Sequence, residues 1–234
     1  MNRAALVEIA EAWFQEQDWK PFPFQKQTWQ AFLQGKHGLL NAPTGSGKTY
    51  ALWIPIVLDI IKQNPEYKTN PKKGLKAIWI TPLRALSVEI QQAAERFVAG
   101  VDAPFTVGIR TGDTSQKERT AQKRKMPDLL ITTPESLQLL LASKGYAKTF
   151  ENLHAVVIDE WHELLGSKRG VQMELALSRL KVVAPRLRIW GISATIGNLE
   201  QARDVLLGTD QKSLENSVLI KANIQKKITV KSII

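Results

Sequence analysis

Residues 42–49, which read APTGSGKT, constrain the fold of this chain more than any other segment. They follow a short apolar stretch at 38–41, and an apolar helical pattern begins at Lys48. A glycine-rich loop between a strand and a helix turns its backbone N–H groups inward, where they hold phosphate oxygens at the positive end of the helix. Ala42 stands where the strict pattern has glycine. The sequence therefore predicts a strand–loop–helix unit that binds phosphate groups.

Two side chains of this loop add chemistry of their own. Lys48 carries a charge that can reach the outer phosphates of a nucleoside triphosphate, and the Thr49 hydroxyl can bind Mg²⁺. The backbone of the loop supplies the other contacts. The predicted nucleotide-binding residues here are Thr44, Gly45, Ser46, Gly47, Lys48 and Thr49.

A second polar segment follows a buried strand predicted at 155–158. Asp159 and Glu160 stand at the carboxyl end of that strand, where open α/β sheets place their sites. We expect Asp159 to hold Mg²⁺ through water and Glu160 to polarise the attacking water. The alternative is a strand that merely ends in solvated acids. The presence of the phosphate loop in the same chain favours the catalytic interpretation over this alternative. His162 is also a catalytic candidate, although a lone histidine is more often structural.

Composition bounds the class of protein. The chain has 234 residues, of which 44% are hydrophobic, and we expect one domain over residues 1–234. The absence of cysteine excludes disulfides and thiolate metal sites. No stretch approaches the ~20 apolar residues of a membrane span, and the N-terminus is no secretory signal, so we expect a cytoplasmic protein without a membrane partner. The net charge of +10 alone is equally consistent with a charge that serves solubility, but beside a triphosphate site it predicts a nucleic-acid partner.

Short apolar strands alternate with helical patterns along the chain. This alternation predicts an α/β fold, with a mostly parallel sheet and helices on both faces. We expect Pro55 to kink the helix that begins at Lys48 or to loosen its hydrogen bonding. The predicted strands are 38–41, 77–81, 105–110, 129–132, 155–158 and 188–192, with extended pieces at 218–220 and 228–230. The predicted helices are one through Leu6 and Trp13, then 24–33, one from Lys48, one through Leu86 and Phe97, then 134–143, 171–183 and, as the last, 199–207.

Several segments of the chain resemble the motifs of one family. Residues 42–49 and 159–162, with Ser193, Ala194 and Thr195, resemble superfamily 2 helicases of the DExH type. The blocks between them follow the order of that family, and they are 81–86 (TPLRAL), 110–114 (RTGDT) and 132–136 (TTPES).

The finer resemblance is to one branch of these helicases. The run DEWHELLGSKRG at 159–170 is similar to the large helicase-related, or Lhr-type, branch. Trp29 and the pair Phe24–Gln25 are similar to the ligase-associated DExH helicases within it. The resemblance extends from about Trp13 to the end of the chain.

The resemblance implies that this chain is a RecA-like P-loop domain and the first of two such lobes. It places a Q motif in N-terminal helices at 1–35, and it implies that 221–234 begin the connection to a missing second lobe. The sequence has no Gln-x-x-Gly-Arg-x-Gly-Arg stretch, which in the family supplies arginine fingers worth roughly 10³–10⁵ in rate. We therefore expect the chain alone to bind nucleotide and to hydrolyse it poorly.

The resemblance also assigns roles to residues outside the two main motifs. Gln25 would recognise adenine and so make ATP the ligand, and a surface glutamine is the alternative. Ser193 and Thr195 would couple the acids to bound nucleic acid, and a strand-end turn is the alternative. For Thr133 a simple helix cap is an equally good alternative to a nucleic-acid contact. A basic cluster at 117–125 is more often a solvated helix face than a binding surface. The predicted nucleic-acid contacts are Arg84, Gly112, Asp113, Thr133, Pro134, Lys168 and Arg169.

The function implied for the whole protein is ATP-driven, Mg²⁺-dependent movement along single-stranded DNA with 3′-to-5′ polarity. RNA–DNA hybrids are further candidate substrates, and DNA repair beside a nuclease and a DNA ligase is the implied setting. The first alternative is a nucleic-acid-stimulated ATPase that remodels complexes without unwinding. A non-catalytic nucleic-acid-binding module is the second, and a metabolic kinase is a distant third.

Overall fold

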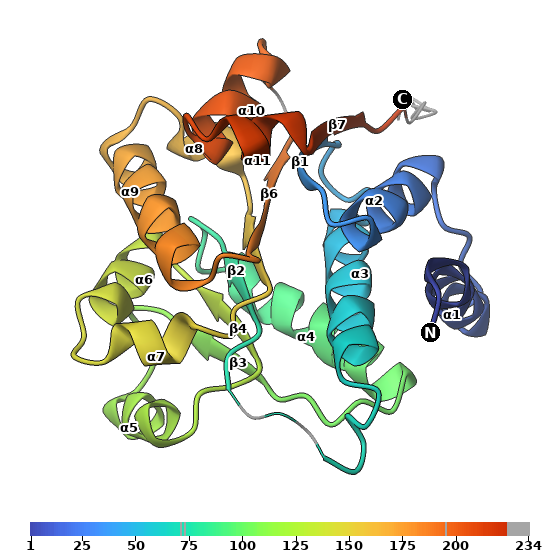
Figure 1. Ribbon diagram of the computed structural model, residues 1–234, viewed down its shortest axis with the longest axis horizontal. Helices are drawn as coiled ribbons and strands as arrows, with labels where there is room; N and C mark the ends of the chain where they lie inside the picture. Colours follow the sequence, from blue (N-terminus) through green and yellow to red (C-terminus); the bar gives the residue numbers. More distant parts are fainter. Residues whose placement is uncertain (71, 73, 195, 224–234) are drawn as a thin grey trace, which may run out of the picture.

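The computed structural model describes residues 1–70, 72, 74–194 and 196–223 of the chain. Within these residues seven strands form one sheet in the order β3-β4-β2-β5-β6-β1-β7. Every neighbouring pair is parallel, which confirms the predicted parallel sheet (Figure 1). The strands are β1 His37–Asn41, β2 Ala77–Ile80, β3 Val107–Arg110, β4 Leu129–Thr132, β5 Ala155–Ile158, β6 Arg188–Ser193 and β7 Ser217–Lys221.

Helices cover both faces of the sheet, as the alternation of strands and helices predicts (Figure 1). One face packs against α2 (Pro23–Leu33), α3 (Lys48–Gln63) and α4 (Leu86–Gly100), and α1 (Arg3–Glu16) packs on the outer side of α2 and α3. The other face packs against α6 (Pro134–Leu141), α7 (Tyr146–Phe150), α8 (Trp161–Leu164), α9 (Lys168–Val183) and α10 (Leu199–Leu207). Alternate residues of the strands serve the two faces, so Trp79 and Val157 lie in the first core and Ile78 and Val156 in the second.

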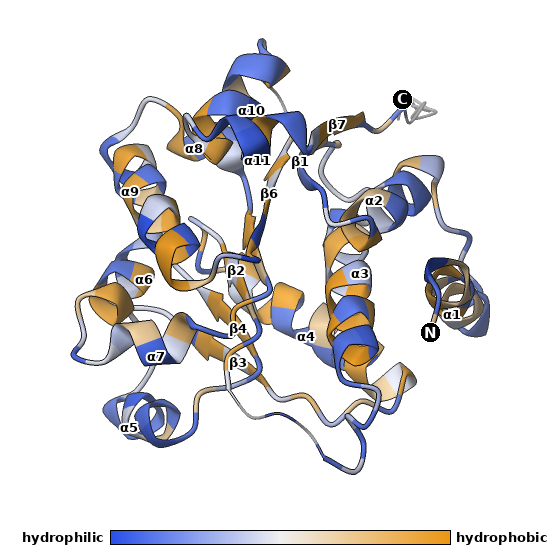
Figure 2. Ribbon diagram, in the orientation of Figure 1, coloured by the Kyte–Doolittle hydropathy of each residue, from blue (hydrophilic) through white to orange (hydrophobic). Residues whose placement is uncertain are grey.

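Some elements of the structure are not among those that the sequence predicts. The helix 199–207 is not the last, because α11 (Gln211–Glu215) follows it. The helix α3, by contrast, runs from Lys48 to Gln63 with Pro55 inside it, so the predicted helix is confirmed and the effect of Pro55 on its geometry stays a prediction. The charged segment near 117–125 contains α5 (Gln116–Arg124), which begins with a capping box between Ser115 and Glu118 and buries no residue. Figure 2 shows α5 as largely hydrophilic. The extended piece expected at 228–230 lies outside the described residues.

The parallel sheet brings the candidate motifs to one edge. The loop 42–47 follows β1, Asp159 follows β5, Thr81 follows β2 and Ala194 follows β6. In the sheet β2, β5, β6 and β1 are consecutive neighbours, so the carboxyl ends of these four strands meet at the same edge. Among the described residues, none of the helices has both the length and the apolar character of a membrane span.

Candidate functional site

The loop after β1 has the backbone that phosphate binding requires. Gly45 and Gly47 have φ angles of +75° and +81°, a left-handed conformation that glycine adopts without steric cost. Gly47 is the N-cap of α3, and its carbonyl accepts a hydrogen bond from Ala51 N in the first turn of the helix. Thr49 lies in that first turn, and Thr44 lies in the loop itself. The loop thus ends at the positive end of a helix dipole.

Ser46 provides a test of whether a ligand fits this loop. Only 5% of the residue is exposed, and its hydroxyl has no hydrogen-bond partner among the described residues. A buried hydroxyl without a protein partner is unfavourable by itself, so such groups are usually bonded to an ordered water or a ligand. A phosphate oxygen accepts such a bond, and therefore the residues present fit a phosphorylated ligand.

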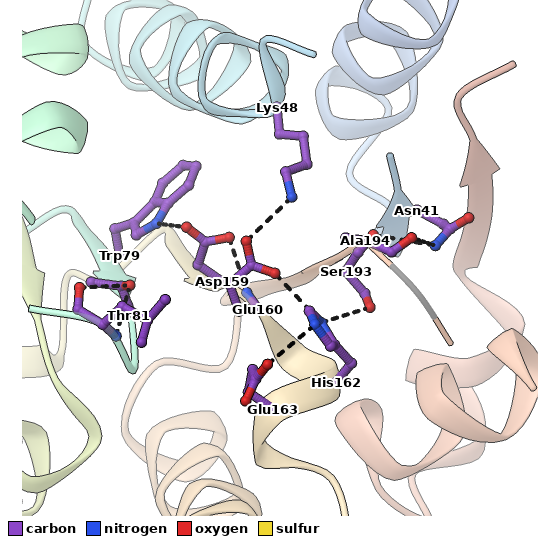
Figure 3. Close-up of polar contacts among 11 residues, drawn as sticks. Asn41, Lys48, Trp79, Thr81, Asp159, Glu160, His162, Glu163, Ser193 and Ala194 are labelled. Atoms are coloured by element: carbon purple, nitrogen blue, oxygen red, sulfur yellow. Dashed lines mark hydrogen bonds and ion pairs between the residues drawn. The ribbon is translucent and has the colours of Figure 1, made fainter. Parts of the chain in front are cut away.

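An ion pair between Lys48 and Glu160 connects the phosphate loop to the acidic segment after β5. The Lys48 ammonium lies 3.4 Å from Oε1 of Glu160 (Figure 3). Glu160 has a left-handed backbone, with φ of 46°, which is unfavourable for a residue that is not glycine. Conformations of this kind cost roughly 1–3 kcal/mol and concentrate at functional sites. The Glu160 side chain reaches Lys48 of the phosphate loop from this backbone.

Asp159 is held by donors on both carboxylate oxygens. The indole Nε1 of Trp79 donates to Oδ2 at 3.3 Å, and the backbone N of Glu160 donates to Oδ1 at 3.0 Å (Figure 3). Burial and the neighbouring Glu160 carboxylate raise the pKa of Asp159 to about 6, while Lys48 and the Trp79 bond act in the opposite direction. A buried carboxylate beside a like charge is a place where a bound cation is electrostatically favoured.

His162 joins the acids to the end of β6. Its Nδ1 lies 3.4 Å from Oε2 of Glu160 and 3.2 Å from the Ser193 hydroxyl (Figure 3). Its Nε2 lies 3.6 Å from Oε1 of Glu163. Ser193 therefore lies in the same network as the acids, while Thr195 falls outside the described residues.

Asn41 is a member of this network that the sequence analysis missed. Its amide nitrogen donates to the carbonyl oxygens of Ser193 at 3.2 Å and of Ala194 at 3.1 Å. Asn41 thereby ties the strand before the phosphate loop to the segment after β6 (Figure 3). The available signal was a polar amide at the end of an otherwise apolar strand.

Gln25 lies against the phosphate loop and is not a surface residue. Only 2% of it is exposed. Its Oε1 accepts a hydrogen bond from Phe22 N at 2.8 Å, and its Nε2 donates to Gly47 O at 3.0 Å. The amide thus links the start of α2 to the N-cap of α3. Recognition of adenine by Gln25 stays a prediction.

Two loops that carry predicted nucleic-acid contacts meet at an ion pair. Arg84 Nη1 lies 2.9 Å from Oδ1 of Asp113, and both side chains are largely exposed. A Cβ on Gly112 would lie 2.6 Å from Arg84 Nη2, so a side chain there would require the flexible end of Arg84 to shift. Arg119 supports the same loop by donating to the carbonyls of Thr111, Gly112 and Thr114. Arg119 is therefore not simply part of a solvated basic face.

A second group of predicted contacts surrounds Arg169. Its Nε lies 2.8 Å from Oε1 of Glu135, and its Nη2 donates to Pro82 O at 3.3 Å. The Thr133 side chain accepts a hydrogen bond from Ser136 N and caps α6, where Pro134 takes the first helical position. Lys168 begins α9 and is exposed. The cap is the role that the contacts of Thr133 show, and its binding role stays a prediction.

The family described as DEAD/DEAH box helicase matches residues 22–202, which is most of the chain. The chain belongs to the DEAD/DEAH box helicase family. The match begins just before α2 and ends within α10, so it contains the phosphate loop, the acids and Ser193.

Two relatives from this helicase family are similar over most of the chain. The Lhr helicase/uracil glycosylase of Escherichia coli is 36% identical over 85% of this chain and 14% of the relative. The ATP-dependent helicase Lhr-Core of Sulfolobus acidocaldarius is 37% identical over 84% of this chain and 23% of the relative. This chain therefore spans less than a quarter of the length of either relative.

Solved helicase structures share the fold of this chain. The structure of Mycobacterium smegmatis helicase Lhr bound to ssDNA and AMP-PNP matches with a TM-score of 0.78 at 29% identity, over 91% of this chain and 27% of that one. The helicase MrfA bound to DNA matches with a TM-score of 0.74 at 22% identity, which supports the fold alone. The α/β fold of this chain is that of a RecA-like helicase lobe.

Proposed function

We propose that this chain is the ATP-binding first lobe of an Lhr-type, ligase-associated DExH helicase. The whole protein would couple ATP hydrolysis to 3′-to-5′ movement along single-stranded DNA. The observation that carries the proposal is the convergence of Lys48, Asp159 and Glu160 at the carboxyl edge of the sheet, with Lys48 and Glu160 3.4 Å apart. A relative of similar fold, the M. smegmatis Lhr, has been solved with ssDNA and AMP-PNP.

The phosphate loop would bind the triphosphate through groups that the chain already holds in place. The backbone N–H groups at Gly45–Lys48 and the Ser46 hydroxyl would face the phosphate oxygens, and Lys48 would neutralise the outer ones. Thr49 and Asp159 would hold Mg²⁺, whose chemistry here is to neutralise charge on the phosphates. No cluster of three or more metal-ligating side chains exists among the described residues, and Mg²⁺ sites of this kind complete their shell with phosphates and water.

Glu160 would act on the attacking water. In the present geometry its Oε1 is paired with Lys48, so a phosphate that draws Lys48 away leaves that oxygen as an acceptor for water. His162 lies on the other carboxylate oxygen and on Ser193 and would transmit changes between the acids and the segment after β6. Gln25 would add the preference for ATP.

Nucleic acid would bind through phosphates and not through bases. The charge of +10 favours a polyanion, and contacts from arginine, helix N-termini and backbone N–H groups do not distinguish sequences. The proposed contacts are Arg84, Gly112, Asp113, Thr133, Pro134, Lys168 and Arg169. Single-stranded DNA is the proposed track, and an RNA–DNA hybrid is the second candidate.

A second RecA-like lobe would complete the ATPase in the full-length protein, since no arginine-finger motif exists in this sequence. A nuclease and a DNA ligase in repair are the proposed partners, on the resemblance to ligase-associated helicases. The proposal also predicts weak hydrolysis by these 234 residues alone.

The test is ATP hydrolysis by the full-length protein with and without single-stranded DNA, with Lys48→Ala as the comparison. Strong stimulation by DNA that the variant loses supports the proposal. Hydrolysis that ignores both DNA and RNA contradicts it. A strand-displacement assay then separates a helicase from an ATPase that only remodels complexes, because the latter releases no strand.

A further inference from the structure

Trp79 is a buried aromatic residue whose polar atom reaches the candidate metal site. It lies on β2, it is completely buried, and its backbone pairs with Val157, two residues before Asp159 on the adjacent β5. Its indole Nε1 donates to Oδ2 of Asp159 at 3.3 Å (Figure 3). The core thus places a hydrogen-bond donor directly behind the acid.

Together with the backbone, this bond fixes the Asp159 carboxylate. The main chain of Asp159 is held by the hydrogen bond from its N to Ile80 O at 2.8 Å. The indole holds Oδ2, and Glu160 N holds Oδ1 at 3.0 Å. A carboxylate with one donor on each oxygen cannot rotate freely about its last torsion, and each oxygen still has a lone pair for a further contact.

The indole suits this task because it is neutral. A lysine or arginine at the same place would hold the carboxylate equally well, but it would cancel the negative charge that attracts a divalent cation. Partners of this kind, one shell behind the ligand, commonly change metal affinity by roughly 10–100-fold when they are removed.

We propose that Trp79 is a positioning residue that presets the Asp159 carboxylate for the Mg²⁺ that accompanies the nucleotide. This inference rests on the proposed function, since it assumes that Asp159 meets the metal of a bound Mg²⁺–nucleotide. It assigns a role in metal binding to a residue that otherwise belongs to the hydrophobic core.

The chain offers a matched control in Trp53. The rings of Trp53 and Trp79 pack against each other at 5.1 Å, and both residues are completely buried. The Trp53 Nε1, however, has no hydrogen-bond partner in the part of the chain that the structure describes. Trp53→Phe and Trp79→Phe therefore make the same change of volume in the same cluster, and only the second removes a donor from Asp159.

The experiment measures the affinity of the chain for AMP-PNP by titration calorimetry, once with Mg²⁺ and once with EDTA. The ratio of the two affinities is the gain due to the metal. We expect Trp79→Phe to reduce this gain about tenfold with little change in the metal-free affinity. Trp53→Phe should keep the gain of the wild type. If the phenyl ring of Trp79→Phe does not pack in the core, Trp79→Leu is the second variant and should show the same loss.

A double mutant identifies the route of the effect. Asp159→Asn should sharply reduce the gain due to Mg²⁺, and adding Trp79→Phe to it should change nothing further. An unchanged gain in Trp79→Phe, or an equal loss in Trp53→Phe, overturns the inference and leaves the proposed function intact. A wild-type chain whose nucleotide affinity ignores Mg²⁺ refutes the proposed metal site itself.

Discussion

The ammonium of Lys48 lies 3.4 Å from a carboxylate oxygen of Glu160, and only 10% and 12% of the two side chains are exposed. The group proposed to bind the outer phosphates and the group proposed to activate water are thus each other's partners in this structure. In the proposed mechanism a phosphate that binds Lys48 competes with Glu160, and this pair separates before hydrolysis.

Glu160→Gln should separate nucleotide binding from hydrolysis. The amide keeps the size of the side chain but cannot accept a proton, so we expect ATP turnover by the full-length protein to fall by roughly 10²–10⁴. Loss of the charge also frees Lys48, and the affinity for AMP-PNP should be retained or increased. Steady-state turnover and calorimetry on the same preparation check both parts, and a variant that still turns over ATP at the wild-type rate excludes Glu160 as the base.

Gln25→Ala should weaken discrimination between nucleobases. The wild-type amide is buried, and its hydrogen bonds with Phe22 and Gly47 fix its orientation. A base that Gln25 recognises would therefore meet an amide that is already oriented. We expect the preference for ATP over GTP to fall about tenfold, since sites built around a hydrogen bond reject ligands that lack it. Gln27→Ala, at an exposed position of the same helix, is the control. Equal preferences in wild type and Gln25→Ala would leave Gln25 as a link between α2 and the loop.

The sequence predicts the elements and motifs of this fold well because their signals are local. The phosphate loop, the apolar run before Asp159 and Glu160, and the alternation of strands and helices each lie within a few neighbouring residues. They establish the parallel sheet, and with it the meeting of β1, β5 and β6 at one edge.

The contacts that refine the site could not be predicted in this way. Trp79 and Asp159 are 80 residues apart in sequence, and Asn41 and Ser193 are 152 apart. In sequence Trp79 is one more apolar residue of a buried strand and Arg119 is one more charge in a basic run. Only the order of the strands and the path of each loop reveal what their polar atoms reach. Short helices such as α8, with 4 residues, are likewise fixed by packing and not by periodicity.

Gly112→Ala should weaken binding of single-stranded DNA without unfolding the protein. The new Cβ would lie 2.6 Å from Arg84 Nη2, and the mobile end of the arginine can move aside, which displaces it from Asp113. Because the proposed track uses this loop and Arg84, we expect affinity for a labelled oligonucleotide to fall by roughly 3–10-fold. Gly197→Ala, where a Cβ meets nothing within 4 Å, is the matched control. Fluorescence anisotropy measures the affinity for DNA, and thermal melting checks that the variant stays folded. Wild-type affinity in Gly112→Ala would remove this loop from the track.

The stability of the chain should decrease below pH 6.5 because of His37. Burial, with help from Lys181 and Arg188 and against Asp210, lowers the pKa of His37 from 6.5 to about 4. Its Nδ1 accepts a hydrogen bond from Ile189 N at 3.1 Å, and protonation removes that acceptor. Since the unfolded chain binds the proton more readily than the folded one, this contribution is complete above pH 6.5 and is lost as the pH falls toward 4.

The loss of unfolding free energy attributable to His37 between pH 6.5 and 4 should be about 2–3 kcal/mol. This is less than the whole pKa shift would give, because the side chain is only partly buried and solvent screens its interactions. His37→Asn keeps an acceptor near the position of Nδ1 and does not titrate, so its unfolding free energy should depend less steeply on pH. His154, whose pKa burial also lowers, leaves a residual dependence in the variant. Urea unfolding at pH 7.5, 6 and 5 compares the two proteins, and parallel pH profiles would show that His37 does not carry the acid sensitivity.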